Sequence, residues 1–181
     1  MTDISLPDRH LADHKIMVID QFLPNIDLFL HELYSIPVYT PNEFNARFGH
    51  KQTYPGLRSN LLKEEHPILF SLIVQNLVKV PFLDKFSLDL YLHLRREQDN
   101  AVDSIHKDIT DYSFLIYLNP TNINSGTCFY DENNQPIADV KYVQNRFVIF
   151  NGSYNHKGYG HFGNTSRDGR LTANGFLSVK S

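Results

Sequence analysis

The sequence has no tryptophan and a single cysteine, Cys128, among its 181 residues. One cysteine cannot form an internal disulfide, so a disulfide-stabilised scaffold and a multi-cysteine zinc site are both excluded. No apolar run is long enough to span a bilayer, and the polar start, residues 1–14, lacks the apolar core of a signal peptide. We therefore expect a cytoplasmic protein in a reducing compartment, with no membrane partner.

A strong excess of charge of either sign is also missing. The chain carries 17 Lys and Arg against 20 Asp and Glu, a formal net charge of −3. This balance gives no general attraction for nucleic acid, so we expect no nucleic-acid partner. With 41% hydrophobic and 20% charged residues, the composition is typical of a globular protein. Since no internal repeat or Gly/Ser linker interrupts the chain, residues 1–181 are expected to form one domain.

Apolar periodicity predicts helices in the first part of the chain. Residues 26–36 and 66–78 have helical spacing, with Asn25 as the expected N-cap of the first helix. Residues 17–22 are expected to form a short strand. Residues 41–59 show no clear period and are expected to be irregular.

The second part of the chain alternates apolar and polar residues, which predicts strands. The expected strands are residues 86–96, 111–119, 126–131, 140–143, 146–150 and 170–179. Helices followed by many short strands predict an α+β chain whose strands form a double sheet or barrel. We expect a helical N-terminal part, residues 1–80, that backs a jelly-roll core, residues 86–181.

The main candidates for chemistry are histidines and one carboxylate in the strand-rich part. His106 and Asp108 lie one residue apart on an expected strand, so both side chains would point to one face, with Lys107 facing away. A third ligand from a later strand end would complete a set of two histidines and one carboxylate, the facial triad of non-haem iron(II) enzymes. His156, just beyond a strand expected to be buried, is favoured for this place. His161, in a glycine-rich stretch, is the alternative third ligand.

An arginine and a threonine, Arg170 and Thr172, form an R-x-T pair on the last expected strand. A guanidinium at this place suits bidentate pairing with the distal carboxylate of a keto-acid cosubstrate. The sequence thus combines a candidate metal site with a candidate carboxylate site further along the chain.

These motifs together resemble the 2-oxoglutarate/iron(II)-dependent dioxygenase superfamily, in particular its prolyl-hydroxylase-like branch. The matching pieces are H-x-D at 106–108, Y-L-N at 117–119, S-G-T-C-F-Y at 125–130, a strand, turn and histidine at 145–156, and R-L-T at 170–172. The resemblance implies a double-stranded β-helix (jelly roll), with Fe(II) and 2-oxoglutarate as cofactors. It implies that His106, Asp108 and His156 are the catalytic metal ligands.

The resemblance also assigns the cosubstrate site and the reaction. Arg170 would pair with the C5 carboxylate of 2-oxoglutarate, and Thr172 and Tyr117 would each add a hydroxyl hydrogen bond. With O2, the enzyme would hydroxylate an amino-acid, peptidyl or small-metabolite substrate and release succinate and CO2. The substrate itself is not identified by these motifs.

Two other functions stay open. One is a cupin-like metalloenzyme that does not use 2-oxoglutarate, and the other is a non-catalytic jelly-roll binding module. The pair Arg170 and Thr172 favours the oxygenase over the first, and the intact set of metal ligands favours it over the second. Acyl transfer and P-loop phosphate binding lack support, because the sequence has neither G-x-S-x-G nor a Walker motif.

A few further side chains are weaker candidates for the pocket. Tyr54 and Arg58 belong to a Y-P-G-L-R-S turn that either presents the arginine to an anion or is simply solvated. Tyr91, His93 and Arg95 share the non-aliphatic face of one expected strand. That face either borders the mouth of the barrel or forms a polar outer surface of the sheet.

Overall fold

The computed structural model describes residues 16–49, 51, 54–83, 85–99 and 103–179. The strands are β1 (Ile16–Ile19), β2 (Leu57–Arg58), β3 (Phe86–Arg95), β4 (Tyr112–Tyr117), β5 (Asn122–Tyr130), β6 (Pro136–Tyr142), β7 (Phe147–Asn151), β8 (Asn155–Tyr159) and β9 (Arg170–Val179). The helices are α1 (Asp27–Ser35), α2 (Pro41–Phe48), α3 (Leu62–Glu65), α4 (Pro67–Asn76) and the short 3-10 helix η1 (Leu77–Lys79).

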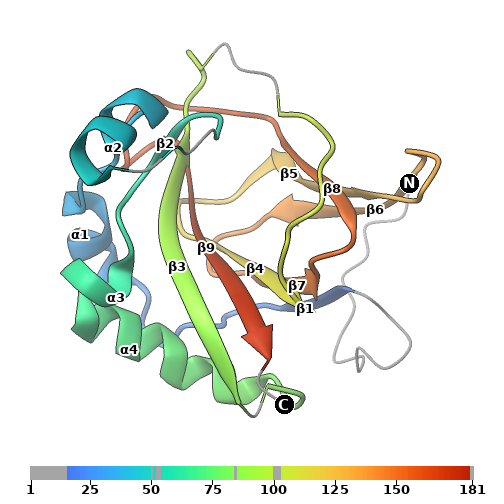
Figure 1. Cartoon of the computed structure of the whole chain (residues 1–181), viewed down its shortest axis with the longest axis horizontal. Coiled ribbons are helices and arrows are strands. Elements are labelled where there is room, and N and C mark those ends of the chain that lie inside the picture. The colour runs from blue at the N-terminus through green and yellow to red at the C-terminus, as the bar shows by residue number, and fades with distance from the viewer. Residues whose placement is uncertain (1–15, 50, 52–53, 84, 100–102, 180–181) are drawn as a thin grey trace.

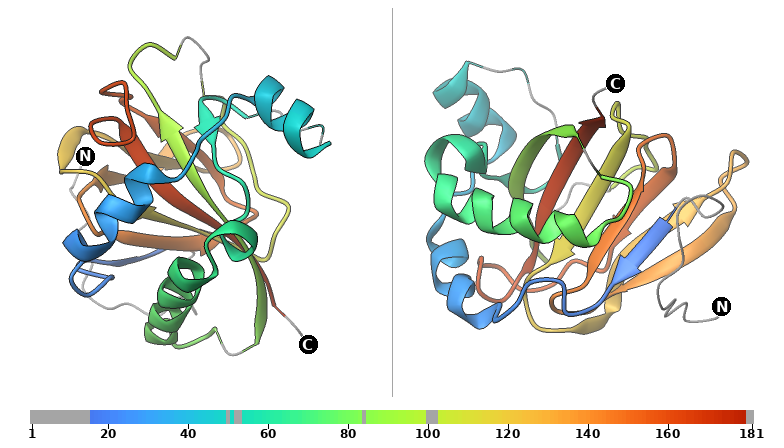
Figure 2. Two further views of the ribbon diagram at one scale, coloured as in Figure 1. Left: turned by 90° about the vertical axis from the view of Figure 1, so that its left-hand side faces the viewer. Right: turned by 90° about the horizontal axis from the view of Figure 1, so that it is seen from below.

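The strands form two antiparallel sheets. The larger sheet has the order β1-β7-β4-β9-β3-β2, and the smaller one has the order β6-β5-β8. Helices gather on one side of the larger sheet, and the smaller sheet lies on the other (Figures 1 and 2). This arrangement is a double-stranded β-helix backed by N-terminal helices, so the predicted α+β jelly roll is confirmed.

The alternation of β3 gives the larger sheet two chemically different faces. β3 pairs with β9 so that Leu92 lies opposite Ala173, and His93 lies opposite Thr172. Aliphatic and polar rows therefore alternate across the sheet, each on its own face. The aliphatic face packs against the helices, where Leu69 of α4 is almost fully buried. Each fully buried leucine side chain of this kind stabilises the fold by about 1.5–3 kcal/mol.

The opposite face of the larger sheet packs against the smaller sheet through aromatic side chains. Tyr117 stacks on Tyr142 with ring centroids 4.6 Å apart, and Phe129 meets Phe150 edge-on at 5.0 Å. Such aromatic pairs add about 0.5–1.5 kcal/mol beyond the area that they bury. This second core holds the two sheets together beside the cavity that Phe150 also lines.

A buried asparagine joins the N-terminal segment to the strands. The Asn145 side chain accepts a hydrogen bond from the backbone N–H of Leu23 and donates one to its carbonyl, both at 2.8 Å. The backbone of Asn145 is left-handed, with φ of 62°, a conformation that asparagine tolerates better than most residues. Next to it, Arg146 donates to the Asp20 carboxylate at 2.6 Å, which lowers the pKa of that carboxyl group. These contacts fix β1 at the edge of the larger sheet.

Several expectations about the N-terminal part are wrong in detail. The first strand ends at Ile19 rather than at residue 22. Asn25 is not the N-cap of α1, because Ile26 holds that position and Asn25 has a left-handed φ of 52°. Within the described part of the chain, no helix combines the length and the apolarity that crossing a bilayer requires.

The expectation that residues 41–59 are irregular is also wrong. Pro41 begins helix α2, and Thr40 caps it: the Glu43 backbone N–H donates to the threonine hydroxyl, and the Glu43 carboxylate accepts from the Thr40 N–H. The signal was in the sequence as T-P-N-E, a capping box with proline at the first helical position. The short strand β2 follows and pairs with β3.

The segment that carries the H-x-D motif is not a strand. His106 forms one isolated antiparallel bridge with His156, and its neighbours lie in irregular structure. In contrast, residues 155–159 form β8, a strand that apolar alternation did not predict because it carries few apolar side chains.

Candidate functional site

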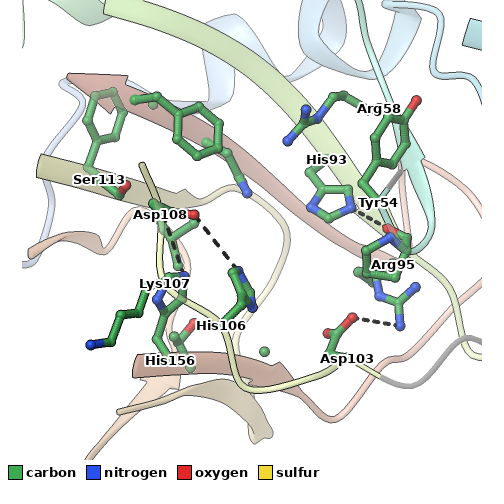
Figure 3. Close-up of a pocket in the computed structure, with 18 of the residues that line it drawn as sticks. Tyr54, Arg58, His93, Arg95, Asp103, His106, Lys107, Asp108, Ser113 and His156 are labelled. Atoms are coloured by element: carbon green, nitrogen blue, oxygen red, sulfur yellow. Dashed lines mark hydrogen bonds and ion pairs between the residues drawn. The ribbon is translucent and has the colours of Figure 1, made fainter. Parts of the chain in front are cut away.

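A cavity of about 880 Å³ lies beside the polar face of the larger sheet. Charged and histidine side chains from distant parts of the chain converge on it, as Figure 3 shows. They include three arginines and the three predicted metal ligands: Arg58, Arg95, Arg170, His106, Asp108 and His156.

The predicted metal ligands His106, Asp108 and His156, here called the His–Asp–His cluster, meet at one point of this cavity. Each offers one ligand atom, and these atoms all lie within 4.8 Å of one another. Asp108 Oδ1 is 3.9 Å from His106 Nε2, and Oδ2 is 3.6 Å from His156 Nε2. The two histidines are joined through their backbones by hydrogen bonds of 3.1 and 2.9 Å. The Asp108 N–H donates to Gly152 O at 2.9 Å, which fixes the third member.

Both histidine rings are oriented by backbone carbonyls. Nδ1 of His106 lies 2.9 Å from Ser104 O, and Nδ1 of His156 lies 3.0 Å from Tyr154 O. A carbonyl oxygen only accepts, so each Nδ1 carries the hydrogen and each Nε2 keeps its lone pair. Metal-binding histidines typically show this arrangement. The donor set of two imidazole nitrogens and one carboxylate fits a divalent metal such as iron(II).

The electrostatics of the cluster favour the metal-binding form of His156. Burial lowers the pKa of this imidazole, the neighbouring His106 lowers it further, and Asp108 opposes both effects. The ring is therefore neutral at a lower pH than an ordinary histidine. Since a metal binds the neutral imidazole, protons compete less at this position.

Arg170 is the second predicted element of the site. It is 4% exposed, and its Nη2 donates to Gly126 O at 3.0 Å and lies 3.4 Å from Thr127 Oγ1. Its Nε is buried without a hydrogen-bond partner. Among the described residues, no carboxylate lies within ion-pair distance of Arg170. A buried guanidinium with unused donors on a cavity suits a carboxylate ligand.

The two hydroxyls predicted to assist Arg170 lie behind the cavity wall. Tyr117 donates to Thr127 Oγ1 at 2.8 Å, and Thr172 donates to Asn174 Oδ1 at 2.6 Å. Both are fully buried. The side chains that reach the cavity in their place are Thr127 and Asn174, which sequence reasoning missed. Asn174 could have been found from the strand period, since it lies two residues after Thr172.

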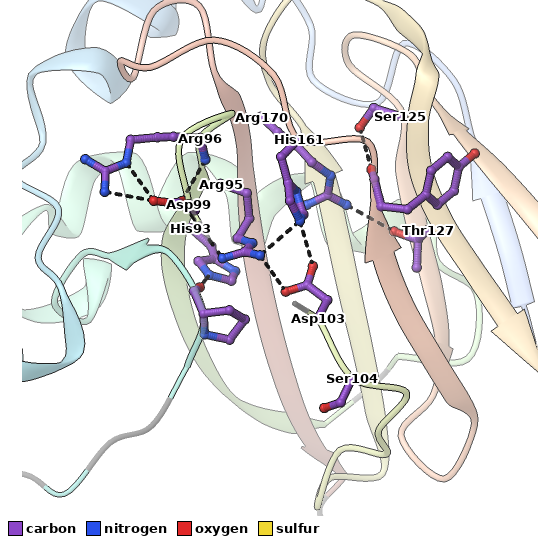
Figure 4. A network of polar contacts seen from close by, with 12 residues as sticks. His93, Arg95, Arg96, Asp99, Asp103, Ser104, Ser125, Thr127, His161 and Arg170 are labelled. Carbon is purple, nitrogen blue, oxygen red and sulfur yellow. Dashed lines mark hydrogen bonds and ion pairs between the residues drawn. The ribbon is translucent and has the colours of Figure 1, made fainter. Parts of the chain in front are cut away.

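His161, the alternative third ligand, belongs to a different group of contacts (Figure 4). Its Nε2 lies 2.9 Å from Arg95 Nη2 and 3.5 Å from Asp103 Oδ2. Arg95 also pairs with Asp103 at 3.0 Å. Burial lowers the pKa of His161, and Arg95 lowers it further. The structure thus groups His161 with Arg95 and places His156 with Asp108.

Of the weaker candidates, Tyr54, Arg58, His93 and Arg95 all line the cavity. A polar outer surface is therefore the wrong interpretation for His93 and Arg95. The His93 Nε2 lies 2.6 Å from Pro55 O, which requires a hydrogen on this nitrogen. Burial, reinforced by the charge of Arg58, lowers the pKa of His93 to about 3. His93 is thus a neutral neighbour in a cavity of charged groups.

Comparison with solved structures gives clear likenesses, although no protein-family model and no curated protein sequence matches the chain. A prolyl-4-hydroxylase from Pseudomonas putida is 15% identical with a TM-score of 0.57, covering 94% of this chain and 96% of that one. HygX from Streptomyces hygroscopicus, with nickel and 2-oxoglutarate bound, is 15% identical with a TM-score of 0.63, covering 91% and 83%. The non-heme alpha-ketoglutarate-dependent carbocyclase SnoK from nogalamycin biosynthesis is 11% identical with a TM-score of 0.63, covering 95% and 82%. At these identities the likeness establishes the fold.

Proposed function

Because the chain has the double-stranded β-helix fold of the 2-oxoglutarate/iron(II) oxygenases, we propose that it is a non-haem iron(II), 2-oxoglutarate-dependent oxygenase. Its proposed reaction is hydroxylation of an amino-acid, peptidyl or small-metabolite substrate. One observation carries the proposal. The His–Asp–His cluster lines the same cavity as Arg170, which has no carboxylate partner among the described residues. Fold alone does not decide function, and SnoK is named a carbocyclase, so the site has to carry the argument.

In this proposal His106, Asp108 and His156 hold iron(II), and Arg170 pairs with the distal carboxylate of 2-oxoglutarate. When bound with O2, the two cofactors supply the oxidising power: one oxygen atom enters a substrate C–H bond as a hydroxyl group, and the other enters succinate as CO2 leaves. The Thr127 hydroxyl, 3.4 Å from Arg170 Nη2 and on the cavity wall, would assist the carboxylate.

The protein's own contribution is to orient the ligands and to exclude water. The carbonyls of Ser104 and Tyr154 fix the two imidazole rings. The Phe150 ring packs against the His156 ring at 4.6 Å, with Phe129 behind it at 6.1 Å. These rings leave His156 7% exposed, so bulk water has little access to that side of the cluster.

The test is an anaerobic titration of the metal-free protein with iron(II) and 2-oxoglutarate, followed by visible absorbance. A keto acid that chelates iron(II) through its carboxylate and keto oxygens gives a metal-to-ligand charge-transfer band. We expect the band in the native protein and its loss in His156→Ala. In Arg170→Gln it should need a much higher 2-oxoglutarate concentration, because the distal carboxylate loses its partner.

Arg47→Gln is the matched control, since Arg47 is an exposed arginine that stacks on Tyr39 and Phe48 outside the cavity. It should leave the titration unchanged. A native protein that binds iron(II) but gives no band would contradict the proposal and favour a cupin-like metalloenzyme. A protein that binds neither iron(II) nor 2-oxoglutarate would favour a binding module.

A further inference from the structure

Arg58 is a second arginine in the cavity without an acidic partner. It lies at the end of β2, and Figure 3 draws it with His93 on one side of the cavity and the His–Asp–His cluster on the other. Its Nε is buried without a hydrogen-bond partner. Among the residues that the structure describes, no carboxylate lies within ion-pair distance of its guanidinium. The residue as a whole is partly buried, and the part of a cation that is withdrawn from water is costly unless something pairs with it.

Aromatic rings hold the Arg58 guanidinium in place. Its Cζ lies 4.7 Å from the ring centroid of Tyr54, 4.6 Å from that of Tyr91 and 5.7 Å from that of Phe176. Cation–π contacts of this kind stabilise the charge in part, but an aromatic ring offers no oxygen or nitrogen acceptor. They satisfy none of its N–H donors, which point outward in the plane of the group. The three aromatic rings therefore orient the arginine, and among the described residues its Nε keeps an unused hydrogen-bond donor.

The backbone under Arg58 is also fixed. Its N–H donates to Tyr39 O at 2.9 Å, and its carbonyl accepts from the Tyr39 N–H at 2.8 Å. On its other side Arg58 pairs with His93 of β3. The turn before it requires glycine, because Gly56 has φ of 81° and a Cβ there would collide with the backbone oxygen of Leu94. A cation held this firmly is preorganised for a ligand and needs little reordering on binding.

Among the arginines that line the cavity, the charge balance leaves Arg58 unassigned; Lys107 also lines the cavity, but it is exposed to solvent. Arg95 pairs with Asp103, Asp108 belongs to the metal cluster, and Arg170 is assigned to 2-oxoglutarate by the proposed function. A doubly charged metal and doubly charged 2-oxoglutarate cancel each other, so their binding adds no anion for Arg58. The neighbouring His93 is neutral and adds none either.

We propose that Arg58 binds a carboxylate of the substrate, so that the substrate is a small carboxylic acid or free amino acid; this rests on the proposed oxygenase function. A carboxylate carries one negative charge, which matches the single uncompensated guanidinium, whereas a phosphate monoester carries nearly two. Arg58 and the metal cluster line one cavity, so the carboxylate on Arg58 directs a nearby C–H bond of the same molecule towards the cluster. Burial lowers the pKa of Arg58, and Tyr91, Tyr54 and Asp108 oppose this lowering. Hydroxylation of that bond follows the balance given above, with O2 and 2-oxoglutarate as the oxidants.

The test uses two probes of nearly equal shape, propionate and propionamide, of which only the first carries a charge. The protein is loaded with 2-oxoglutarate and zinc(II), a diamagnetic substitute for iron(II) on the same donor types. Saturation-transfer NMR gives the affinity of each probe. We expect propionate to bind, propionamide to bind at least about tenfold more weakly, and Arg58→Gln to lose the preference, as the loss of a charged hydrogen bond implies. Arg58→Lys should keep part of it, because lysine keeps the charge and loses the planar fork.

Arg47→Gln is again the matched control and should bind propionate as the native protein does. A thermal melt of each variant shows whether it is folded. Equal binding of the two probes, or unchanged propionate binding in Arg58→Gln, would overturn the proposal. Two further results would also overturn the proposal. Inorganic phosphate that binds at Arg58 more tightly than propionate would make the ligand a phosphate, and an alanine pentapeptide that binds more tightly would make it the C-terminus of a peptide.

This experiment and the absorbance titration fail independently. If the charge-transfer band forms but the affinity for propionate does not depend on Arg58, the oxygenase function stands and the proposed substrate class is wrong. If propionate binding depends on Arg58 but no band forms, Arg58 is an anion site in a protein that is not a 2-oxoglutarate oxygenase.

Discussion

His93 makes the stability of this protein depend on pH in a way that can be calculated. An unfolded histidine has an ordinary pKa of 6.5, whereas in the fold the pKa of His93 falls to about 3. Below the ordinary value, the unfolded chain takes up a proton that the folded chain cannot accept. Stability is therefore highest above pH 6.5 and falls as the pH drops, until the folded-state value is reached.

The size of the effect follows from the gap between the two pKa values. One proton difference changes the free energy of unfolding by about 1.4 kcal/mol per pH unit. Lowering the pH two units below the ordinary value, to about 4.5, should therefore remove about 2–3 kcal/mol through His93 alone. For a protein of ordinary stability, about 5–15 kcal/mol, this is a substantial share.

The variant His93→Gln isolates this contribution. A glutamine amide still has a donor for Pro55 O, the acceptor of the present hydrogen bond, and it does not titrate. Urea unfolding of both proteins near neutral pH and near pH 4.5 gives four free energies, and other titrating groups cancel in the double difference. We expect the native protein to lose about 2–3 kcal/mol more than the variant. Parallel losses in the two proteins would refute the argument, because they would mean that the His93 ring is protonated as easily in the fold as in the unfolded chain.

Other substitutions test other parts of the structure. At a nickel(II) concentration about 100 times the dissociation constant, binding should stabilise the fold by about 2.7 kcal/mol, or about 5–11 °C in a thermal melt. The shift should vanish in His156→Ala and persist in His161→Ala, and the reverse result would move the third ligand to His161. Asn145→Ala removes both hydrogen bonds to Leu23 and should destabilise the fold by about 2–4 kcal/mol in urea unfolding. Asn145→Gly should recover about 1–2 kcal/mol of this, since glycine accepts the left-handed backbone; no recovery would contradict the role of backbone conformation. Thr40→Ala should lower the free energy of unfolding by about 1 kcal/mol through loss of the helix cap. A melting temperature equal to that of the native protein would show that the cap does not stabilise the fold.

Four strands of the larger sheet, β3, β4, β7 and β9, were the most predictable part of the fold. In β3 every second residue is a leucine, and the structure buries Leu88, Leu90, Leu92 and Leu94 on the helix-covered face. Alternation works there because one face meets an apolar layer and the other meets a polar cavity. β8 escaped detection because it pairs with β5 at the edge of the smaller sheet and buries little apolar surface. Helix α2 escaped because the prediction weighed apolar period and overlooked the cap at Thr40.

For the site, the local spacing of residues was informative, whereas contacts between residues far apart in the sequence could not be predicted. The H-x-D spacing suggested that His106 and Asp108 share a target, although the strand assumed for them is absent. The Y-P-G-L-R-S turn made Arg58 a pocket candidate, but its place beside His93 depends on the pairing of β2 with β3, which no local pattern predicts. The same holds for His161, whose contact with Arg95 spans 66 positions. Such neighbours depend on sheet register, which a single sequence does not reveal.

The two hydrogen bonds between the Asn145 side chain and the Leu23 backbone limit the order in which this protein can fold during synthesis. The two residues are 122 positions apart, and β1 finds its partner β7 only after Asn145 has been made. At the rate of translation that interval lasts about 6–24 s, during which the apolar strand β1 lacks its partner β7. His156 lies further along still, so the three members of the His–Asp–His cluster can meet only after residue 156 has been made. Chaperone binding to the nascent chain should therefore concentrate on this early segment.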